Sequence, residues 1–434
     1  MPHPTSIADA ASQIRNGSLR PIDLVDRCLE QIRRYDDRLH AWVLVDEAAA
    51  RQTARALADA TPRGPLHGIP LGIKDIVDVA GLPTRAGSPL REDHIAAADA
   101  PIVAALRRAG AVILGKTVTV EFACFDPSPT LNPWDPAGKH TPGGSSSGSA
   151  VAVAMGMCLG AIGTQTGGSL VRPSSYCGVA TCKPAWGRLS TQGIVPVSYH
   201  LDHPGPIARY VDDLAILMRC LLSEKEPSPS AAAEPPRVGL LEGFFLEEAD
   251  EAIRTATATA LEKLRHDGME IRTAGVSARF DDVLPNHRRI MAAEAAAYHR
   301  PQFTAHREAY GPLIAGLLDE GLAMPAVDYA DALAWQRDFR RRVRSLFESF
   351  DVLISPATDT TAPPTLTTTG TPKFQAPWSC AGLPVVSIPC GLAHDGMPAA
   401  LQLVSLPGAE AMLLETAEAC QQSLAFNGLP PLMR

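Results

Sequence analysis

The segment Thr141–Pro173 decides how this chain folds, because it holds two glycine- and serine-rich runs with an apolar stretch between them. The first run, Thr141–Ala150, reads TPGGSSSGSA, and the second, Gly163–Ser169, reads GTQTGGS. The small apolar residues of Ala150–Ile162 predict one tightly buried helix between the runs. Glycine and serine contribute little to a core. Two donor-rich loops at the ends of a buried element therefore indicate either a binding site or two plain surface loops.

The composition describes a globular protein with a large interior. The chain has 434 residues, of which 46% are hydrophobic and 20% charged. The net charge of −8 argues against a nucleic-acid partner, which requires a basic footprint. No apolar run approaches the length of a membrane span, and the first residues do not resemble a secretory signal.

The cysteines and histidines indicate neither disulfides nor a metal site. Nine cysteines are scattered along the chain without a Cys-x-x-Cys pair, so we expect reduced thiols and a cytoplasmic location. His200 and His203 lie three residues apart, but no further histidine or cysteine cluster completes a metal shell. We expect neither a metal ion nor another cofactor.

Helical and strand patterns alternate along the chain, which predicts α/β layering. Ser18 is the expected N-cap of the second helix. Residues 223–236, rich in proline, serine and alanine, predict a linker or a long surface excursion. Helices are predicted at 7–14, 21–35, 48–58, 101–110, 214–222, 249–265 and 409–422, and helices that could serve as a lid at 292–297, 313–318 and 329–350. Strands are predicted at 68–76, 111–116, 238–241, 269–271, 351–355 and 385–388.

Lys74 lies near the end of the apolar, glycine- and proline-punctuated strand Gly68–Ile76. Most lysines in such a position extend their ammonium group to solvent. A lysine at a glycine-flanked strand end can also be desolvated, kept neutral and used as a base. The neighbouring Asp75 would favour the charged form, but strand alternation points its side chain the other way.

The run Gly144–Gly148 formally matches the G-x-S-x-G nucleophile elbow, with Ser146 as nucleophile. That motif needs a strand immediately before it and a helix after it. The preceding residues Asp135–Pro142 do not read as a strand, which argues against an α/β-hydrolase.

The combination of motifs resembles the amidase signature family over about residues 18–403. The resemblance rests on the following segments: Gly68–Asp75, Gly143–Ala150, Thr166–Ser169 with Pro173, Tyr176–Gly178, Lys183–Pro184, Trp186–Arg188, Gly205–Arg209 and Gly382–Pro389. It implies one α/β domain spanning 1–434, in which a large mixed, twisted β-sheet lies between layers of α-helices. Residues 223–236 would then be a surface excursion.

The resemblance also assigns roles to residues. Lys74 matches the family's catalytic lysine, and Ser145 matches the bridging serine that family members hold on a cis peptide bond. Ser169 matches the nucleophile that accepts the acyl group. The oxyanion hole is expected from the backbone N–H groups of Thr166, Gly167, Gly168 and Ser169, and substrate binding from Gly144 and Arg172.

These roles make physical sense. A serine hydroxyl is a poor nucleophile unless a base lies within reach, and these motifs contain no histidine. A buried, neutral Lys74 can take the proton of Ser169 through Ser145 and return it to the leaving amine. Glycines at 167 and 168 let the backbone N–H groups approach the developing oxyanion.

Two positions depart from the usual family pattern. Gln165 stands where many members carry an acid, and Val171 where many carry an arginine, which here follows at Arg172. This arrangement is most similar to the malonamidase-like branch, in which the equivalent arginine binds a substrate carboxylate. The other interpretation is that Arg172 pairs with an acidic side chain of the scaffold.

The resulting prediction is an amidase that hydrolyses the C–N bond of small linear amides through an acyl-serine. A carbamate (urethane) or aryl-acylamide hydrolase would need the same triad. The glutaminase-type component of a tRNA-dependent amidotransferase, its A subunit, is a further alternative, although the chain is short for it and its acidic charge offers no tRNA footprint. A catalytically dead scaffold is disfavoured because the lysine and both serines are present. The motifs do not determine the oligomeric state, and a homodimer is compatible with them.

Overall fold

Alternate residues of the central strands face two different hydrophobic cores. On β3 (Val112–Thr117), Ile113 packs into one core, whereas Val112 and Leu114 pack into the other. Successive side chains of a strand point to opposite faces, so apolar residues at every position require a sheet covered on both sides. The computed structural model describes residues 5–222, 235–275 and 279–433.

The described strands form one mixed sheet of eleven, in the order β1-β3-β2-β4-β6-β5-β10-β11-β9-β7-β8. The pairs β3–β2, β2–β4, β9–β7 and β7–β8 are parallel, and the other neighbours are antiparallel. Apart from β3, the strands are β1 (Trp42–Val45), β2 (Pro70–Lys74), β4 (Gly160–Gln165), β5 (Ala180–Lys183), β6 (His203–Ala208), β7 (Val238–Leu241), β8 (Ile271–Ala274), β9 (Val352–Pro356), β10 (Val385–Leu392) and β11 (Pro398–Val404).

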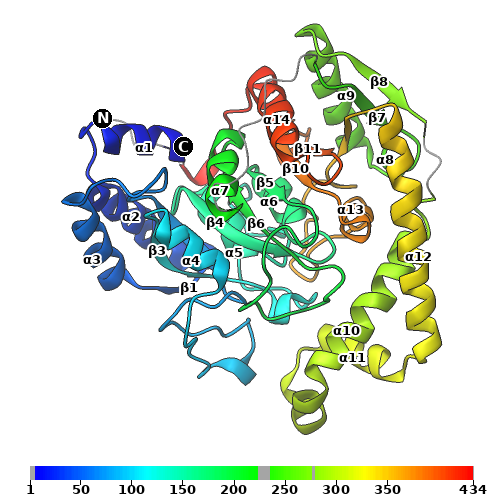
Figure 1. Cartoon of the computed structure of the whole chain (residues 1–434), viewed down its shortest axis with the longest axis horizontal. Helices are drawn as coiled ribbons and strands as arrows, with labels where there is room; N and C mark the ends of the chain where they lie inside the picture. The colour runs from blue at the N-terminus through cyan, green and yellow to red at the C-terminus, as the bar shows by residue number, and fades with distance from the viewer. Residues whose placement is uncertain (1–4, 223–234, 276–278, 434) are drawn as a thin grey trace.

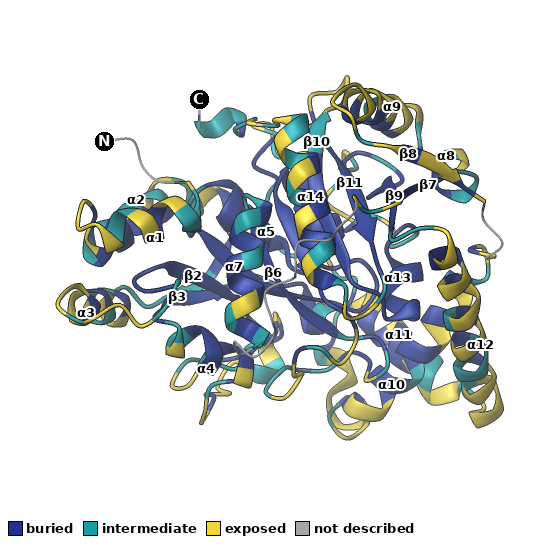
Figure 2. Cartoon of the chain, turned by 45° about the horizontal axis from the view of Figure 1, so that its top comes forward, coloured by how far each residue is buried: buried dark blue, intermediate teal, exposed yellow. Residues whose placement is uncertain are grey.

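Helices cover the sheet. In Figure 2 most strands are buried at the centre, whereas the edge strand β8 has exposed residues, and helices such as α9, α12 and α14 turn exposed surface outward. The helices are α1 (Ile7–Arg15), α2 (Pro21–Leu39), α3 (Glu47–Ala58), α4 (Pro101–Arg108), α5 (Ser147–Ala154), α6 (Val171–Cys177), α7 (Val211–Leu222), α8 (Phe244–Glu247), α9 (Glu251–His266), α10 (Val283–His306), α11 (Pro312–Ala323), α12 (Ala326–Arg344), α13 (Ala376–Ala381) and α14 (Glu410–Leu424). The predicted fold class, a mixed sheet between helical layers, is confirmed.

The prediction of one helix over Ala150–Ile162 was wrong. Helix α5 ends at Ala154, and the chain turns into strand β4 from Gly160. A short run of small apolar residues suits a buried helix and a buried strand equally well. Both elements lie inside the protein, and a Cβ on Gly148 of α5 would come within 2.2 Å of the Ala41 carbonyl oxygen.

Other differences concern the ends of elements. Helix α2 begins after Arg20, not after Ser18, whose hydroxyl instead donates to the carbonyl of Gln13. The strand expected at 269–271 is β8 and begins only at Ile271. The sequence did not predict β6 and β11. Most of the predicted linker, residues 223–234, lies outside the described residues, and the strands before and after it belong to the same sheet.

Helices α10, α11 and α12 form an arm beside the sheet, at the lower right of Figure 1. Helix α10 packs against α11, α12 and α13. This arm contains the helices that the sequence suggested as a lid, and α10 brings His287 towards the second glycine-rich run. Among the described helices, none has both the length and the apolar character needed to cross a membrane.

Candidate active site

Lys74 is the last residue of β2, and its side chain is fully buried. Its Nζ lies 2.6 Å from Ser145 Oγ and 2.9 Å from Thr164 Oγ1, and it donates to both. Burial lowers the pKa of Lys74 to about 7, although the nearby groups of Asp202 and Cys124 oppose the shift. The neutral amine is therefore well populated at neutral pH.

Asp75 points away from Lys74, as strand alternation predicted. One of its carboxylate oxygens lies 2.9 Å from Nζ of Lys116, and the other accepts the N–H of Arg85. Lys74 therefore keeps hydroxyl partners, and the negative charge of Asp75 is used by another lysine.

Ser145 lies in the loop that enters α5, and the Gly144–Ser145 peptide bond is cis, as the family resemblance implied. Ser145 is buried and lines the same cavity as Ser169. Ser146, the residue of the rejected nucleophile elbow, is enclosed in the scaffold, where its hydroxyl donates to the Thr164 carbonyl.

Ser169 lies in the turn between β4 and α6, and Gln165 holds that turn. The Gln165 side-chain oxygen accepts the N–H groups of Leu170 and Val171, each at 3.0 Å. Its amide nitrogen donates to Ser379 Oγ, which in turn donates to the Gly167 carbonyl. A carboxylate could accept the same two N–H groups, but only the amide can also donate to Ser379, and it adds no negative charge.

The glycine pair leaves backbone donors available in this turn. Among the described residues, no protein acceptor is found for the N–H groups of Gly167, Gly168 and Ser169. A Cβ on Gly168 would lie 2.5 Å from Gln375 Oε1, so a larger residue there would force the Gln375 side chain to move. Free N–H groups beside a serine hydroxyl are suited to bind an oxyanion.

Arg172 is buried against the first glycine-rich run. One guanidinium nitrogen donates to the Gly144 carbonyl at 2.8 Å and to Thr369 Oγ1 at 3.1 Å, whereas Nε is buried without a partner. Burial lowers the pKa of Arg172, and the nearby Tyr176 and Asp359 oppose that shift. In the described part of the chain, no carboxylate forms an ion pair with Arg172. The scaffold pairing considered from the sequence is therefore not found there.

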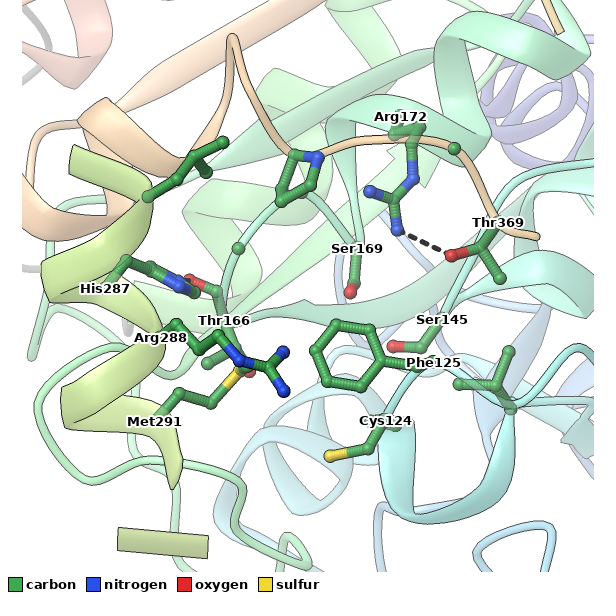
Figure 3. A pocket seen from close by; sticks show the side chains of 17 residues that line it. Cys124, Phe125, Ser145, Thr166, Ser169, Arg172, His287, Arg288, Met291 and Thr369 are labelled. Carbon is green, nitrogen blue, oxygen red and sulfur yellow. Dashed lines mark hydrogen bonds between the residues drawn. The ribbon is translucent and has the colours of Figure 1, made fainter. Parts of the chain in front are cut away.

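Ser145, Ser169 and Arg172 line one cavity of about 230 Å³. Figure 3 shows both serine hydroxyls pointing into it, with Arg172 on one side and α10 on the other. Gly144 is not among the lining residues and contributes its carbonyl to Arg172 instead. The wall is largely apolar and includes Val120, Ala123, Phe125, Leu284, Met291 and Pro372.

Sequence reasoning missed four residues that contact the site. Thr164 accepts from Lys74, Thr369 accepts from Arg172, and Asp202 and His287 both hold Thr166. Two of them had a nearby signal, because Thr164 lies within the run Gly163–Ser169 and Asp202 lies just before the family-like segment Gly205–Arg209. His287 and Thr369 carry no local pattern, since their role arises from contacts with residues far away in the chain.

The described residues include no cluster of three or more histidines, cysteines or acids arranged to hold a metal ion. His203, considered from its spacing to His200, is buried with Nδ1 donating to the Leu201 carbonyl. His200 instead contacts Glu294.

The chain is similar to known proteins over nearly its whole length. The family model described as Amidase matches residues 23–414. The chain is 32% identical to the putative amidase AmiD of Mycobacterium tuberculosis, covering 98% of this chain and 95% of that protein. It is also 32% identical to the A subunit of the glutamyl-tRNA(Gln) amidotransferase of Roseiflexus castenholzii, with 99% and 98% covered. The native peptide amidase structure from Stenotrophomonas maltophilia superposes with a TM-score of 0.84 at 28% identity over the whole of both chains.

The chain therefore belongs to the amidase signature family. It is a hydrolase that cleaves the C–N bond of amides.

Proposed function

We propose that this enzyme hydrolyses small linear amides through an acyl-Ser169 intermediate, with Ser145 as proton relay and Lys74 as base. The observation that carries the proposal is the 2.6 Å contact between Lys74 Nζ and Ser145 Oγ, made by a fully buried lysine whose pKa lies near 7. A base is most effective when its pKa lies near the working pH.

In the acylation step, Ser169 Oγ attacks the substrate carbonyl carbon and passes its proton to Ser145, whose own proton moves to Lys74. The carbonyl oxygen becomes an oxyanion that the N–H groups of Thr166, Gly167, Gly168 and Ser169 would stabilise. When the C–N bond breaks, Lys74 returns the proton through Ser145 to the departing amine.

Deacylation repeats this sequence with water in place of the amine. Water attacks the acyl-Ser169 ester, and its proton passes through Ser145 to Lys74. Collapse of the second oxyanion then returns the proton to Ser169 and releases the carboxylic acid. The same oxyanion-hole N–H groups and the same Ser145–Lys74 proton relay would therefore serve both acylation and deacylation.

Arg172 is the residue we propose to recognise the acyl group. Its buried Nε lacks a partner, and its guanidinium lines the cavity beside Ser169. A buried cation without an ion-pair contact is costly unless a ligand supplies a carboxylate. The preferred acyl group would then carry an acid close to the scissile carbonyl, which is what the malonamidase-like pattern implied. Gly144 supports this role indirectly, through its carbonyl.

The apolar part of the cavity wall includes Phe125, Leu284 and Met291. In Figure 3, Phe125 and Met291 lie across the cavity from Arg172, with Arg288 between them. This wall supports a leaving group with an apolar substituent. A carbamate or aryl-acylamide would use the same machinery. The A component of an amidotransferase would instead need partner proteins. Because the chain is 32% identical to such a component, the first experiment below also tests this alternative. The homodimer and the cytoplasmic location stay predictions.

The first experiment labels the purified chain with a fluorophosphonate and maps the adduct by peptide mass spectrometry. We expect a single adduct on Ser169, and Ser169→Ala should abolish both labelling and turnover while the melting temperature stays close to that of the wild type. An adduct on another serine would refute the assignment. Turnover of small amides, anilides and carbamates by the isolated chain, measured as released amine, separates the alternatives.

The second experiment tests Arg172 with two amides of equal size, one carrying a carboxylate and one neutral. Arg172→Ala should lower kcat/KM for the acidic amide about ten- to a hundredfold more than for the neutral one, since a charged hydrogen bond contributes about 1.5–3 kcal/mol. An equal loss for both substrates would make Arg172 part of the scaffold.

A further inference from the structure

Thr166, the first residue of the proposed oxyanion hole, is held from two sides. Its side-chain hydroxyl donates to Asp202 Oδ1 at 2.6 Å, and its carbonyl accepts from His287 Nε2 at 3.1 Å. His287 also packs on the next residue, because a Cβ on Gly167 would lie 3.4 Å from its ring. The backbone that carries the free N–H groups is thus fixed at its first residue.

Asp202 is itself held in place by backbone hydrogen bonds. Its second oxygen accepts the N–H groups of Val197 and Ser198 at 2.8 and 3.0 Å. Burial raises the pKa of Asp202 to about 6, opposed by the hydrogen bond from Thr166 and those from the two backbone groups. Above that pH the carboxylate is charged and accepts all three bonds.

The loop that carries Asp202 is tied to the helix that carries His287. Glu294 of α10 is buried and accepts from Ser198 Oγ at 2.5 Å and from the His200 N–H at 3.2 Å. Tyr329 of α12 donates to the same carboxylate at 2.6 Å. Asp202 and His287 therefore both connect Thr166 to the α10–α12 arm. These contacts, from Thr166 through Asp202 and His287 to Glu294, are called the brace below.

We propose that Asp202 and His287 are positioning residues, which aim the oxyanion-hole N–H groups at the reacting carbonyl and couple them to the arm. This inference rests on the proposed function of Ser169 and deepens it. Small displacements of such donors reduce their effect on the transition state much more than they weaken ground-state binding.

Asp202 has a second effect because it also lies near Lys74. The groups that face Lys74 are the Ser145 and Thr164 hydroxyls, the Cys124 thiol and the Asp202 carboxylate. The negative charge of Asp202 favours protonated Lys74 and partly offsets the effect of burial. Asp202 itself is faced by Thr166, by backbone N–H groups and by Glu294. Removing the Asp202 charge should therefore lower the pKa of Lys74.

The test compares Asp202→Asn with Thr166→Val, using kcat, KM and the pH dependence of kcat/KM. Thr166→Val removes the hydroxyl donor, and Asp202→Asn removes the charge and leaves one acceptor oxygen where the carboxylate had two. Each should therefore lower kcat about ten- to a hundredfold, somewhat less than the loss of a whole oxyanion-hole donor, with little change in KM. Only Asp202→Asn should move the acidic limb of the profile to lower pH. A purely structural role would not separate the two variants in this way.

Conservative replacements provide the controls. Thr166→Ser keeps the hydroxyl and should be at least about tenfold faster than Thr166→Val. His287→Gln, which keeps an N–H donor, should likewise be faster than His287→Ala. If Asp202→Asn does not fold, as judged by its melting curve, these two pairs still decide the question.

The inference is overturned if Asp202→Asn and Thr166→Val both keep wild-type kcat, or if the serine and valine variants at 166 are equally slow. Fluorophosphonate labelling of Ser169 in every variant keeps the two proposals separate. Labelling on Ser169 with unchanged kcat refutes only the brace, whereas absence of labelling in the wild type refutes the proposed function itself.

Discussion

Two buried lysines lie at the ends of neighbouring parallel strands and face different partners. Lys74 ends β2 and lies against the hydroxyls of Ser145 and Thr164. Lys116 lies on β3 in register with Ile73, and its Nζ contacts Asp75 at 2.9 Å as well as the Pro83 carbonyl. Both side chains have zero exposure, so burial alone does not distinguish them.

The difference between the two sites lies in where the nearest negative charge is. Burial lowers the pKa of Lys116, but the Asp75 carboxylate opposes the shift, and burial raises the pKa of Asp75 against the charge of Lys116. Lys74 contacts no carboxylate within residues 5–222, 235–275 and 279–433, and burial lowers its pKa to about 7. The same residue type thus serves as one half of an ion pair in one strand and is available as a base in the next.

The largest effect should follow replacement of Lys74. Lys74→Met should reduce kcat/KM by about 10²–10⁴-fold, the usual contribution of general-base catalysis, while leaving the fold intact. Lys183→Met is the matched control, because Lys183 is equally buried and also has a pKa of about 7, but donates only to the carbonyls of Pro184 and Leu383. Steady-state kinetics that show equal losses in the two variants would remove Lys74 from the mechanism.

The second effect concerns stability. Asp75→Asn should lower the free energy of unfolding by about 3–5 kcal/mol, because it leaves Lys116 as a buried charge without its partner. Turnover at 25 °C by the folded variant should persist, since Asp75 does not contact Lys74. Chemical denaturation measures the loss. A change below about 1 kcal/mol would mean that Lys116 is neutral in the native protein.

The third effect is the pH dependence of activity. Lys74 must be neutral to accept a proton, and its pKa is about 7. The value of kcat/KM should therefore rise about tenfold per pH unit below pH 7 and level off above it. A profile that stays flat between pH 5.5 and 8.5 would contradict a neutral-lysine mechanism.

The fourth effect concerns the pH dependence of stability. Lys183 has a pKa of about 7 in the folded protein and about 10.4 when unfolded, so between these values the unfolded chain binds more protons. Stability from this group is complete above pH 10.4 and is lost as the pH falls towards 7. Between pH 7 and 10, the free energy of unfolding should rise less steeply with pH in Lys183→Met than in the wild type. The difference in slope corresponds to at most one proton bound on unfolding. Denaturation curves at several pH values measure that slope, and an unchanged slope would show that Lys183 is charged in the native state.

Much of this protein was determined by local sequence. The apolar runs that became β2, β3, β7, β9 and β10 were predicted, because a strand buried on both faces needs a nearly continuous apolar run. The resemblance to the amidase signature family also pointed to Lys74, Ser145, Ser169 and the glycine pair, and the roles proposed for them suit the chemistry of these residue types. Where two structures suit the same residues, as in Ala150–Ile162, local sequence could not choose between helix and strand.

Only the tertiary structure decided what each side chain faces. Gly72-Ile73-Lys74 and Leu114-Gly115-Lys116 look alike as sequence, yet one lysine meets a serine 71 residues away and the other meets Asp75. His287 reaches Thr166 across 121 residues, and Arg172 reaches Thr369 across 197. The charge state of a buried group depends on the dielectric surroundings and partners that distant segments supply. Those partners exist only once the sheet and the arm have packed together.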